Sequence, residues 1–181
     1  CVASEVPVGI MGFGNLGRTV AKTLLANNFP VLGWSRHGAP MDGVQVFSGD
    51  PQLDDFLDRT RILINLLPNT HETTNKLNSK VLSALPLGAG VVNVGRGNQL
   101  VEDDLLTLLN TGHLAGAVLD VFRHEPLPES SPLWGHPKIT ITPHAASEAS
   151  RHDHARYIAD VIKIFEDGGK PDLLYDWDRG Y

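Results

Sequence analysis

Three segments in the second half of the chain carry ionisable side chains just after short apolar runs. Arg96, Glu125 and His144 follow the runs at residues 91–94, 117–121 and 139–142. A guanidinium fork can hold a carboxylate through two hydrogen bonds. An imidazole can exchange a proton near neutral pH, and a carboxylate beside it can hold it in one tautomer. As candidate catalytic residues, the three suit the reduction of a small 2-keto acid.

Each of these residues also has an ordinary interpretation when it is taken alone. Arg96 can be a cation at a helix end, Glu125 a partner for Arg123, and His144 a loop histidine with its hydrogen bonds satisfied. The three together favour a single site, provided that the fold brings them to the same edge.

A glycine pattern near the start of the chain predicts a second centre. Gly12, Gly14 and Gly17 fit G-x-G-x-x-G, with Asn15 and Leu16 inside it, between an apolar strand and an amphipathic helix. In that context Gly12 allows a tight turn, Gly14 lets a pyrophosphate approach the backbone, and Gly17 lets helix and strand pack closely. The first amides of the helix then face the phosphates.

The end of the next predicted strand indicates which dinucleotide is preferred. NAD sites usually have an acidic residue there for the ribose hydroxyl, but this chain has Trp34, Ser35 and Arg36. Ser35 and Arg36 can both donate hydrogen bonds to a 2′-phosphate. We therefore predict NADP(H) as the preferred cofactor, with NAD(H) possible.

Alternating strands and helices must position these residues. The alternation predicts an α/β fold with a doubly wound parallel sheet of the Rossmann type, in a single domain. Strands are expected at residues 6–11, 31–35, 44–47, 62–67, 91–94, 117–121 and 139–142. Helices are expected at residues 15–28, 53–57, 81–85, 102–110 and 149–166. Asp50 is expected to cap the second helix, and Pro51 suits its first turn. Parallel strands end at one edge, where ligands bind.

Composition excludes several classes of protein. The 181 residues are 41% hydrophobic, with a net charge of −6 and a single cysteine. Intrinsic disorder, an intrachain disulfide and a cysteine-based zinc site are therefore poor interpretations. No basic cluster favours nucleic acid, no apolar run is long enough to span a membrane, and cytoplasm is the default location. No metal site is expected, because His152 and His154 are two residues apart on a predicted helix and face different ways.

The motif segments resemble the D-isomer-specific 2-hydroxyacid dehydrogenases. The matching stretches are residues 9–17, 93–97, 119–126 and 142–146, in the order of that family. Further stretches at residues 34–36, 64–70, 101–106, 131–134 and 179–181 resemble its glyoxylate/hydroxypyruvate reductases. Two departures are Gly95, where relatives often have Ala or Ser and the turn is expected to loosen, and Ser147, where many have Gly.

The resemblance implies NADPH-dependent reduction of glyoxylate to glycolate and of hydroxypyruvate to D-glycerate. It assigns Arg96 to the substrate carboxylate, His144 to acid/base chemistry and Glu125 to the support of His144. It places Leu67, Pro68, Val94 and Gly95 along the cofactor groove and Asp120 near the nicotinamide, and it implies a homodimer. Such enzymes have a second, substrate-binding domain. We therefore expect residues 1–181, with a core at about 5–168 and a tail at 169–181, to be the cofactor-binding half, inactive alone.

Three other functions stay open at this level. The chain can be a dinucleotide-sensing, corepressor-like binding protein, because such relatives keep the same fold and the same three residues. It can also be a 2-hydroxyacid dehydrogenase that prefers NAD and another substrate. A different Rossmann dehydrogenase, for example one acting on amino acids, is disfavoured by the combination of Arg96, Glu125 and His144.

Overall fold

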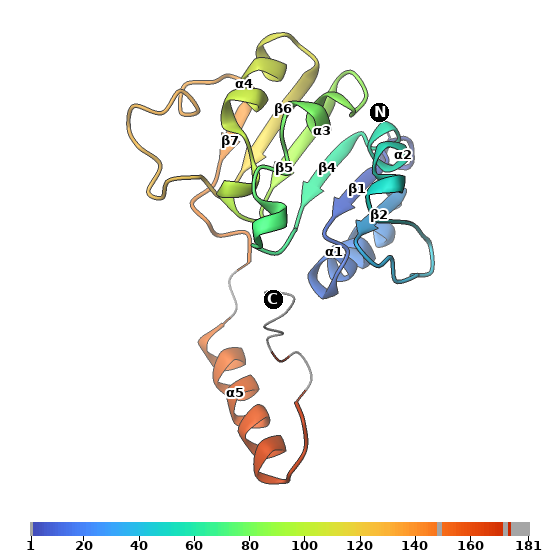
Figure 1. The fold of residues 1–181 in the computed structure, drawn as a ribbon, viewed down its shortest axis with the longest axis vertical. Coiled ribbons are helices and arrows are strands. Elements are labelled where there is room, and N and C mark those ends of the chain that lie inside the picture. Colours follow the sequence, from blue (N-terminus) through green and yellow to red (C-terminus); the bar gives the residue numbers. More distant parts are fainter. Residues whose placement is uncertain (1, 148–149, 172–173, 175–181) are drawn as a thin grey trace.

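A seven-stranded parallel sheet forms the centre of the molecule (Figure 1). The computed structural model describes residues 2–147, 150–171 and 174. The strands lie in the order β3-β2-β1-β4-β5-β6-β7, and each adjacent pair is parallel. They are β1 (Val8–Met11), β2 (Val31–Ser35), β3 (Val44–Ser48), β4 (Ile62–Asn65), β5 (Ala89–Asn93), β6 (Leu114–Leu119) and β7 (Ile139–Ile141).

Helices cover both faces of this sheet. The α-helices are α1 (Asn15–Ala26), α2 (Leu53–Asp58), α3 (Ser79–Ser83), α4 (Glu102–Asn110) and α5 (Arg151–Glu166). Successive strand residues point to opposite faces. Accordingly, Ile10 packs with Ala21 of α1, whereas Met11 belongs to the larger core that holds Phe56, Leu82 and Leu105. The doubly wound arrangement predicted from the sequence is therefore confirmed.

Short 3-10 helices begin several of the connections. They are η1 (Ala3–Glu5), η2 (Asp50–Gln52), η3 (His71–Thr73) and η4 (Gly97–Gln99). The expected capping of α2 by Asp50 is wrong, because η2 precedes α2 and neither start has a side-chain cap. Pro51 does lie in the first turn, but of η2. The Asp50 carboxylate instead pairs with Lys76.

Most of the predicted strands have limits that differ by one to three residues from the observed ones, and in two of them the reason is identifiable. Residues 66 and 67 leave β4 because the Asn65 side chain accepts a hydrogen bond from the Leu67 amide, 3.2 Å long. β6 begins at Leu114, earlier than expected, because Gly116 pairs with Gly90 of β5. Pairing in the sheet here outweighs the weak strand preference of glycine.

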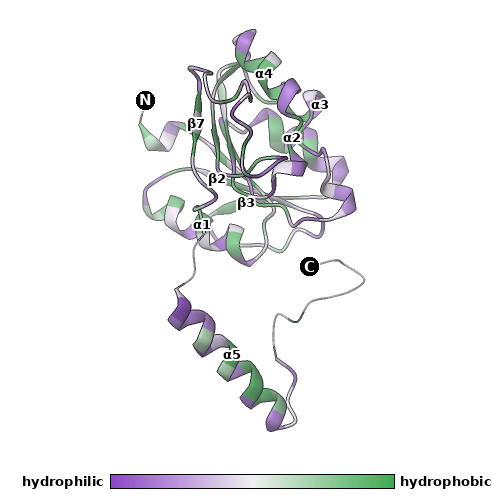
Figure 2. Ribbon diagram, turned by 90° about the vertical axis from the view of Figure 1, so that its left-hand side faces the viewer, coloured by the Kyte–Doolittle hydropathy of each residue, from purple (hydrophilic) through white to green (hydrophobic). Residues whose placement is uncertain are grey.

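The last helix lies apart from the sheet in both ribbon views (Figures 1 and 2). None of the residues of α5 is buried, and Ser150 caps its start by accepting a hydrogen bond from the Asp153 amide. The predicted helix began at residue 149, which lies outside the described residues, as do residues 172–173 and 175–181 of the predicted tail. Among the described helices, none has the length and hydropathy needed to cross a membrane.

Candidate active site

The turn after β1 has the geometry that the glycine pattern predicts. Gly12 has φ of +105°, and a Cβ there would lie 2.4 Å from the Leu66 carbonyl oxygen. A Cβ at Gly17 would lie 2.5 Å from the Gly12 oxygen, so only glycine lets α1 approach the strand this closely. A Cβ at Gly14 would meet nothing within 4 Å. The backbone at Gly14 is therefore open to an incoming group.

A cavity of about 510 Å³ lies beside this turn. Six residues that the sequence assigned to the cofactor line it: Gly12, Gly14, Ser35, Arg36, Leu67 and Pro68. The start of α1 has no side-chain cap and no acidic residue in its first turn. Amides free to bind an anion thus lie beside an opening of suitable size, which fits a dinucleotide.

Not every predicted cofactor residue lines this cavity. Asn15 and Leu16 are exposed at the start of α1, while Val94 and Gly95 follow β5 farther along the same edge. Sequence reasoning missed Trp34, Asp50, Glu72 and Lys76, which also line it. Trp34 adjoins the predicted Ser35, but Glu72 and Lys76 come from a connection in which the sequence carries no motif.

Arg36 is paired across the cavity rather than simply solvated. Its Nη2 lies 2.6 Å from Oε2 of Glu72. The backbone around it is fixed, because Ser35 Oγ accepts from the Gly38 amide at 3.1 Å and Ser48 Oγ donates to the Arg36 carbonyl at 3.3 Å. Two hydrogen bonds therefore hold the turn that carries the Arg36 side chain.

A second centre forms where β6 and β7 end. His144 Nδ1 lies 2.8 Å from Oε2 of Glu125, and the Phe122 amide donates to the other carboxylate oxygen at 2.9 Å. The hydrogen bond from His144 and that from Phe122, together with the charges of His144 and Arg96, lower the pKa of Glu125 below its ordinary value of 4.5. An ionised Glu125 requires a proton on Nδ1, which leaves Nε2 as the free ring nitrogen.

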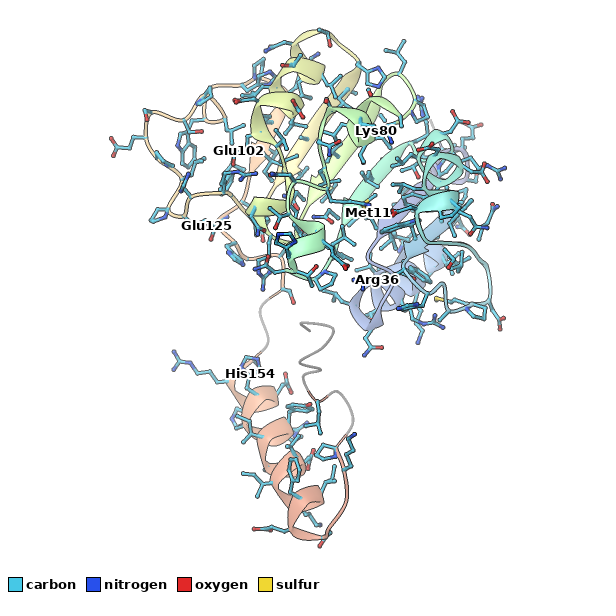
Figure 3. The ribbon with its side chains drawn as sticks, in the orientation of Figure 1. Met11, Arg36, Lys80, Glu102, Glu125 and His154 are labelled. Carbon is cyan, nitrogen blue, oxygen red and sulfur yellow. The ribbon has the colours of Figure 1, made fainter. Side chains whose placement is uncertain are left out.

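The alternative pairing of Glu125 with Arg123 is not what forms. The Arg123 guanidinium instead donates to Asn75 Oδ1 and to the carbonyl of Leu100. The contact between His144 and Glu125 that the sequence predicts is present in the structure. Figure 3 shows Glu125 and Arg36 near the same edge of the sheet. Glu125 lies on the side of β6 and β7, and Arg36 lies on the side of β2.

Asp120 holds the loop that carries His144. The carboxylate is buried, and it accepts hydrogen bonds from the Thr142 hydroxyl and from the Ala145 and Ala146 amides. Burial alone would raise the pKa of Asp120, but these bonds and the His144 charge outweigh it and lower the pKa. His144 itself has φ of +53°, a left-handed conformation that costs free energy in a residue other than glycine. Asp120 therefore grips the loop on both sides of a strained residue.

Arg96 is anchored through a buried amide network. Gln99 Oε1 accepts from the Arg96 amide at 2.9 Å and from Asn65 Nδ2 at 2.7 Å. Gln99 Nε2 donates to the carbonyls of Leu67 and Pro68 at 3.1 and 2.8 Å. Gln99 thus ties the cofactor cavity to the turn that presents Arg96.

The network explains why a residue without a side chain suits position 95. A Cβ there would lie 2.4 Å from Gln99 Oε1 and 2.8 Å from Asn65 Nδ2. The glycine therefore makes room for the Gln99 and Asn65 side chains. Among the described residues, no group of three or more His, Cys, Asp or Glu side chains is arranged to hold a metal ion.

Comparisons with known proteins match this geometry. Residues 3–146 match the family model described as D-isomer specific 2-hydroxyacid dehydrogenase, NAD binding domain. A curated relative, glyoxylate/hydroxypyruvate reductase A of Klebsiella pneumoniae (strain 342), is 47% identical over 99% of this chain. The chain spans only 57% of the length of that relative.

Solved structures give the same picture. A D-isomer specific 2-hydroxyacid dehydrogenase from Xanthobacter autotrophicus Py2, in complex with NADPH and MES, matches 100% of this chain and 75% of its own, with a TM-score of 0.96 and 40% identity. An NADPH-dependent glyoxylate/hydroxypyruvate reductase from Sinorhizobium meliloti, in complex with NADP and sulfate, matches 100% of this chain and 58% of its own, with a TM-score of 0.96 and 37% identity. The chain belongs to the D-isomer specific 2-hydroxyacid dehydrogenase family, and it contains the family's NAD-binding domain.

Proposed function

We propose that this chain is the cofactor-binding, proton-transferring half of an NADPH-dependent reductase of small 2-keto acids, acting on glyoxylate and hydroxypyruvate. The observation that carries the proposal is the hydrogen bond of 2.8 Å between His144 and Glu125. It lies at the strand ends that also hold Arg96 and the dinucleotide cavity. The products are glycolate and D-glycerate.

The roles follow from what each side chain can donate. Arg96 binds the substrate carboxylate with its planar fork. When bound, the nicotinamide supplies a hydride to the keto carbon. His144 gives the Nε2 proton to the oxygen, which would otherwise become an alkoxide. Glu125 is the positioning residue, because its carboxylate holds the imidazole ring through Nδ1.

NADP(H) is the proposed cofactor because the end of β2 carries Ser35 and Arg36 and no carboxylate. The relatives solved with NADPH and NADP support this preference. Titration of the chain with NADPH and with NADH tests it by intrinsic fluorescence, since Trp34 lines the cavity. We expect tighter binding of NADPH, and Arg36→Gln is expected to remove most of the difference. Equal affinities in the wild type would refute the preference.

The remainder of the substrate site is proposed to come from outside the matched region, since the chain spans 57% of its curated relative. Two assays of NADPH oxidation test this, with glyoxylate, hydroxypyruvate and pyruvate as substrates. One uses this chain, and the other a longer form in which the remaining segments of that relative are joined to it. We expect turnover by the longer form and little by the chain alone. A longer form that binds NADPH yet reduces none of the three acids would contradict the proposal and favour a binding protein.

The cytoplasmic location and the homodimer stay predictions from the sequence. Gel filtration of the chain tests the second, and elution at the mass of a single chain would count against it.

A further inference from the structure

Two ion pairs cross the mouth of the dinucleotide cavity. Arg36, after β2, pairs with Glu72 of η3, and Lys76, after η3, pairs with Asp50 after β3. All four residues line the cavity. Lys76 Nζ also lies 5.4 Å from the centroid of the Trp34 ring. The segments after β2 and β3 thus supply one cation and one carboxylate, Arg36 and Asp50, and the segment at η3 supplies the other two, Glu72 and Lys76.

This arrangement bears on how an anion enters. Arg36 and Lys76 are the cations of the cavity lining, and each already contacts a carboxylate oxygen at 2.6 and 3.1 Å. A phosphate on the ribose 2′ position would bind the same guanidinium that Glu72 already contacts through Nη2, so the two anions share one cation. Glu72 also carries charge of the same sign as the phosphate, so that the two repel when both are near Arg36.

We propose that Glu72 is a specificity-determining residue that competes with the 2′-phosphate for Arg36 and so limits the preference for NADPH over NADH. The inference rests on the proposed cofactor function of this cavity. In the structure the Glu72 carboxylate is the anion bound to the Arg36 guanidinium, and a 2′-phosphate would be a second anion drawn to the same cation. NADH lacks that phosphate and therefore leaves the Arg36–Glu72 ion pair intact.

The competition predicts a gain when Glu72 loses its charge. The pair is solvent-accessible, with side-chain exposures of 46% and 68%, so its contribution is modest. Exposed ion pairs of this kind correspond to roughly two- to fivefold in an equilibrium constant. Glu72→Gln is therefore expected to tighten NADPH binding by roughly that factor and to leave NADH binding nearly unchanged.

The experiment measures dissociation constants of NADPH, NADH, adenosine 2′,5′-bisphosphate and 5′-AMP for the full chain by calorimetry. The last two ligands differ only in the 2′-phosphate. The variants are Glu72→Gln, Arg36→Gln and the double variant. Glu129→Gln is the matched control, because it removes the same charge from an exposed glutamate that does not line the cavity.

We expect Glu72→Gln to raise the 2′-phosphate preference in the wild-type background, but not in the Arg36→Gln background or in the control. An unchanged or lowered preference in Glu72→Gln would overturn the inference, as would an equal rise in the Arg36→Gln background. The proposed cofactor preference fails separately, if the wild type binds NADH as tightly as NADPH. In that event a preference that emerges only in Glu72→Gln still supports the competition.

Discussion

The buried side chain of Gln99 offers the sharpest test of how the two centres are joined. Gln99→Met keeps the volume of the side chain but removes both its donor and its acceptor. The Arg96 amide and the Leu67 carbonyl each lose the hydrogen bond that Gln99 makes to them. Asn65 Nδ2 keeps a bond to Asn93 at 2.8 Å, and the Pro68 carbonyl keeps one from the Thr73 hydroxyl at 2.7 Å.

The expected cost follows from that difference. A buried polar group left without a partner costs about 1–3 kcal/mol, and two such groups arise. Since the Arg96 side is partly open to water, we expect Gln99→Met to lower the free energy of unfolding by about 2–4 kcal/mol. Urea unfolding followed by circular dichroism measures this. Gln45→Met is the matched control, because Gln45 is exposed on β3, and its cost is expected to stay within about 0.5 kcal/mol.

A second variant separates this network from a general packing defect. Gly95→Ala places a methyl group against Gln99 Oε1, and overpacking of this kind costs about 1–3 kcal/mol. In Gln99→Ala the closer of the two contacts is gone, while Asn65 Nδ2 stays 2.8 Å from the added Cβ, so Gly95→Ala is expected to cost less there. Strictly additive free energies in this double-mutant cycle would refute the account of Gly95. A Gln99→Met variant as stable as the wild type would refute the account of the network.

Two further predictions concern the carboxylates. Glu125→Gln in the longer, active form is expected to lower kcat for glyoxylate by roughly tenfold or more while the affinity for NADPH is retained; an unchanged kcat would remove Glu125 from the mechanism. Because the pKa of Asp120 is lower in the folded chain than its ordinary value of 3.8, the native state binds fewer protons than the unfolded state between the two values. The contribution of Asp120 to the free energy of unfolding is therefore fully present above about pH 5, and it is lost as the pH falls through the pKa of the folded state. Urea unfolding between pH 3 and 6 measures this, and Asp120→Asn is expected to flatten the profile relative to the exposed control Asp42→Asn; a parallel profile would refute it.

The sequence predicted most of the fold because its strands are apolar and separated by clear turn residues. The helices at residues 15–26 and 102–110 have regular apolar spacing, and their predicted limits, 15–28 and 102–110, lie close to the observed ones. β6 was less accessible to prediction, because its first half contains Gly116 and is formed by pairing with β5. Such pairing depends on residues distant in the sequence, and local patterns do not report it.

The residues of the candidate site likewise fall into those that the sequence could predict and those that it could not. His144 and Glu125 could be paired in advance, because each follows a strand and the parallel topology brings strand ends together. Gln99 and Glu72 could not, because each lies in a short 3-10 segment without a motif. Their roles come from contacts over sequence separations of about 30 residues.

The most direct test of the proposed chemistry is His144→Gln in the longer, active form. Glutamine occupies similar space but cannot donate the proton of an imidazolium. The account predicts that the rate of glyoxylate reduction falls by roughly a hundredfold or more, while the dissociation constant of NADPH stays within about twofold. A variant that reduces glyoxylate at the parental rate would contradict the assignment of His144 as the proton donor.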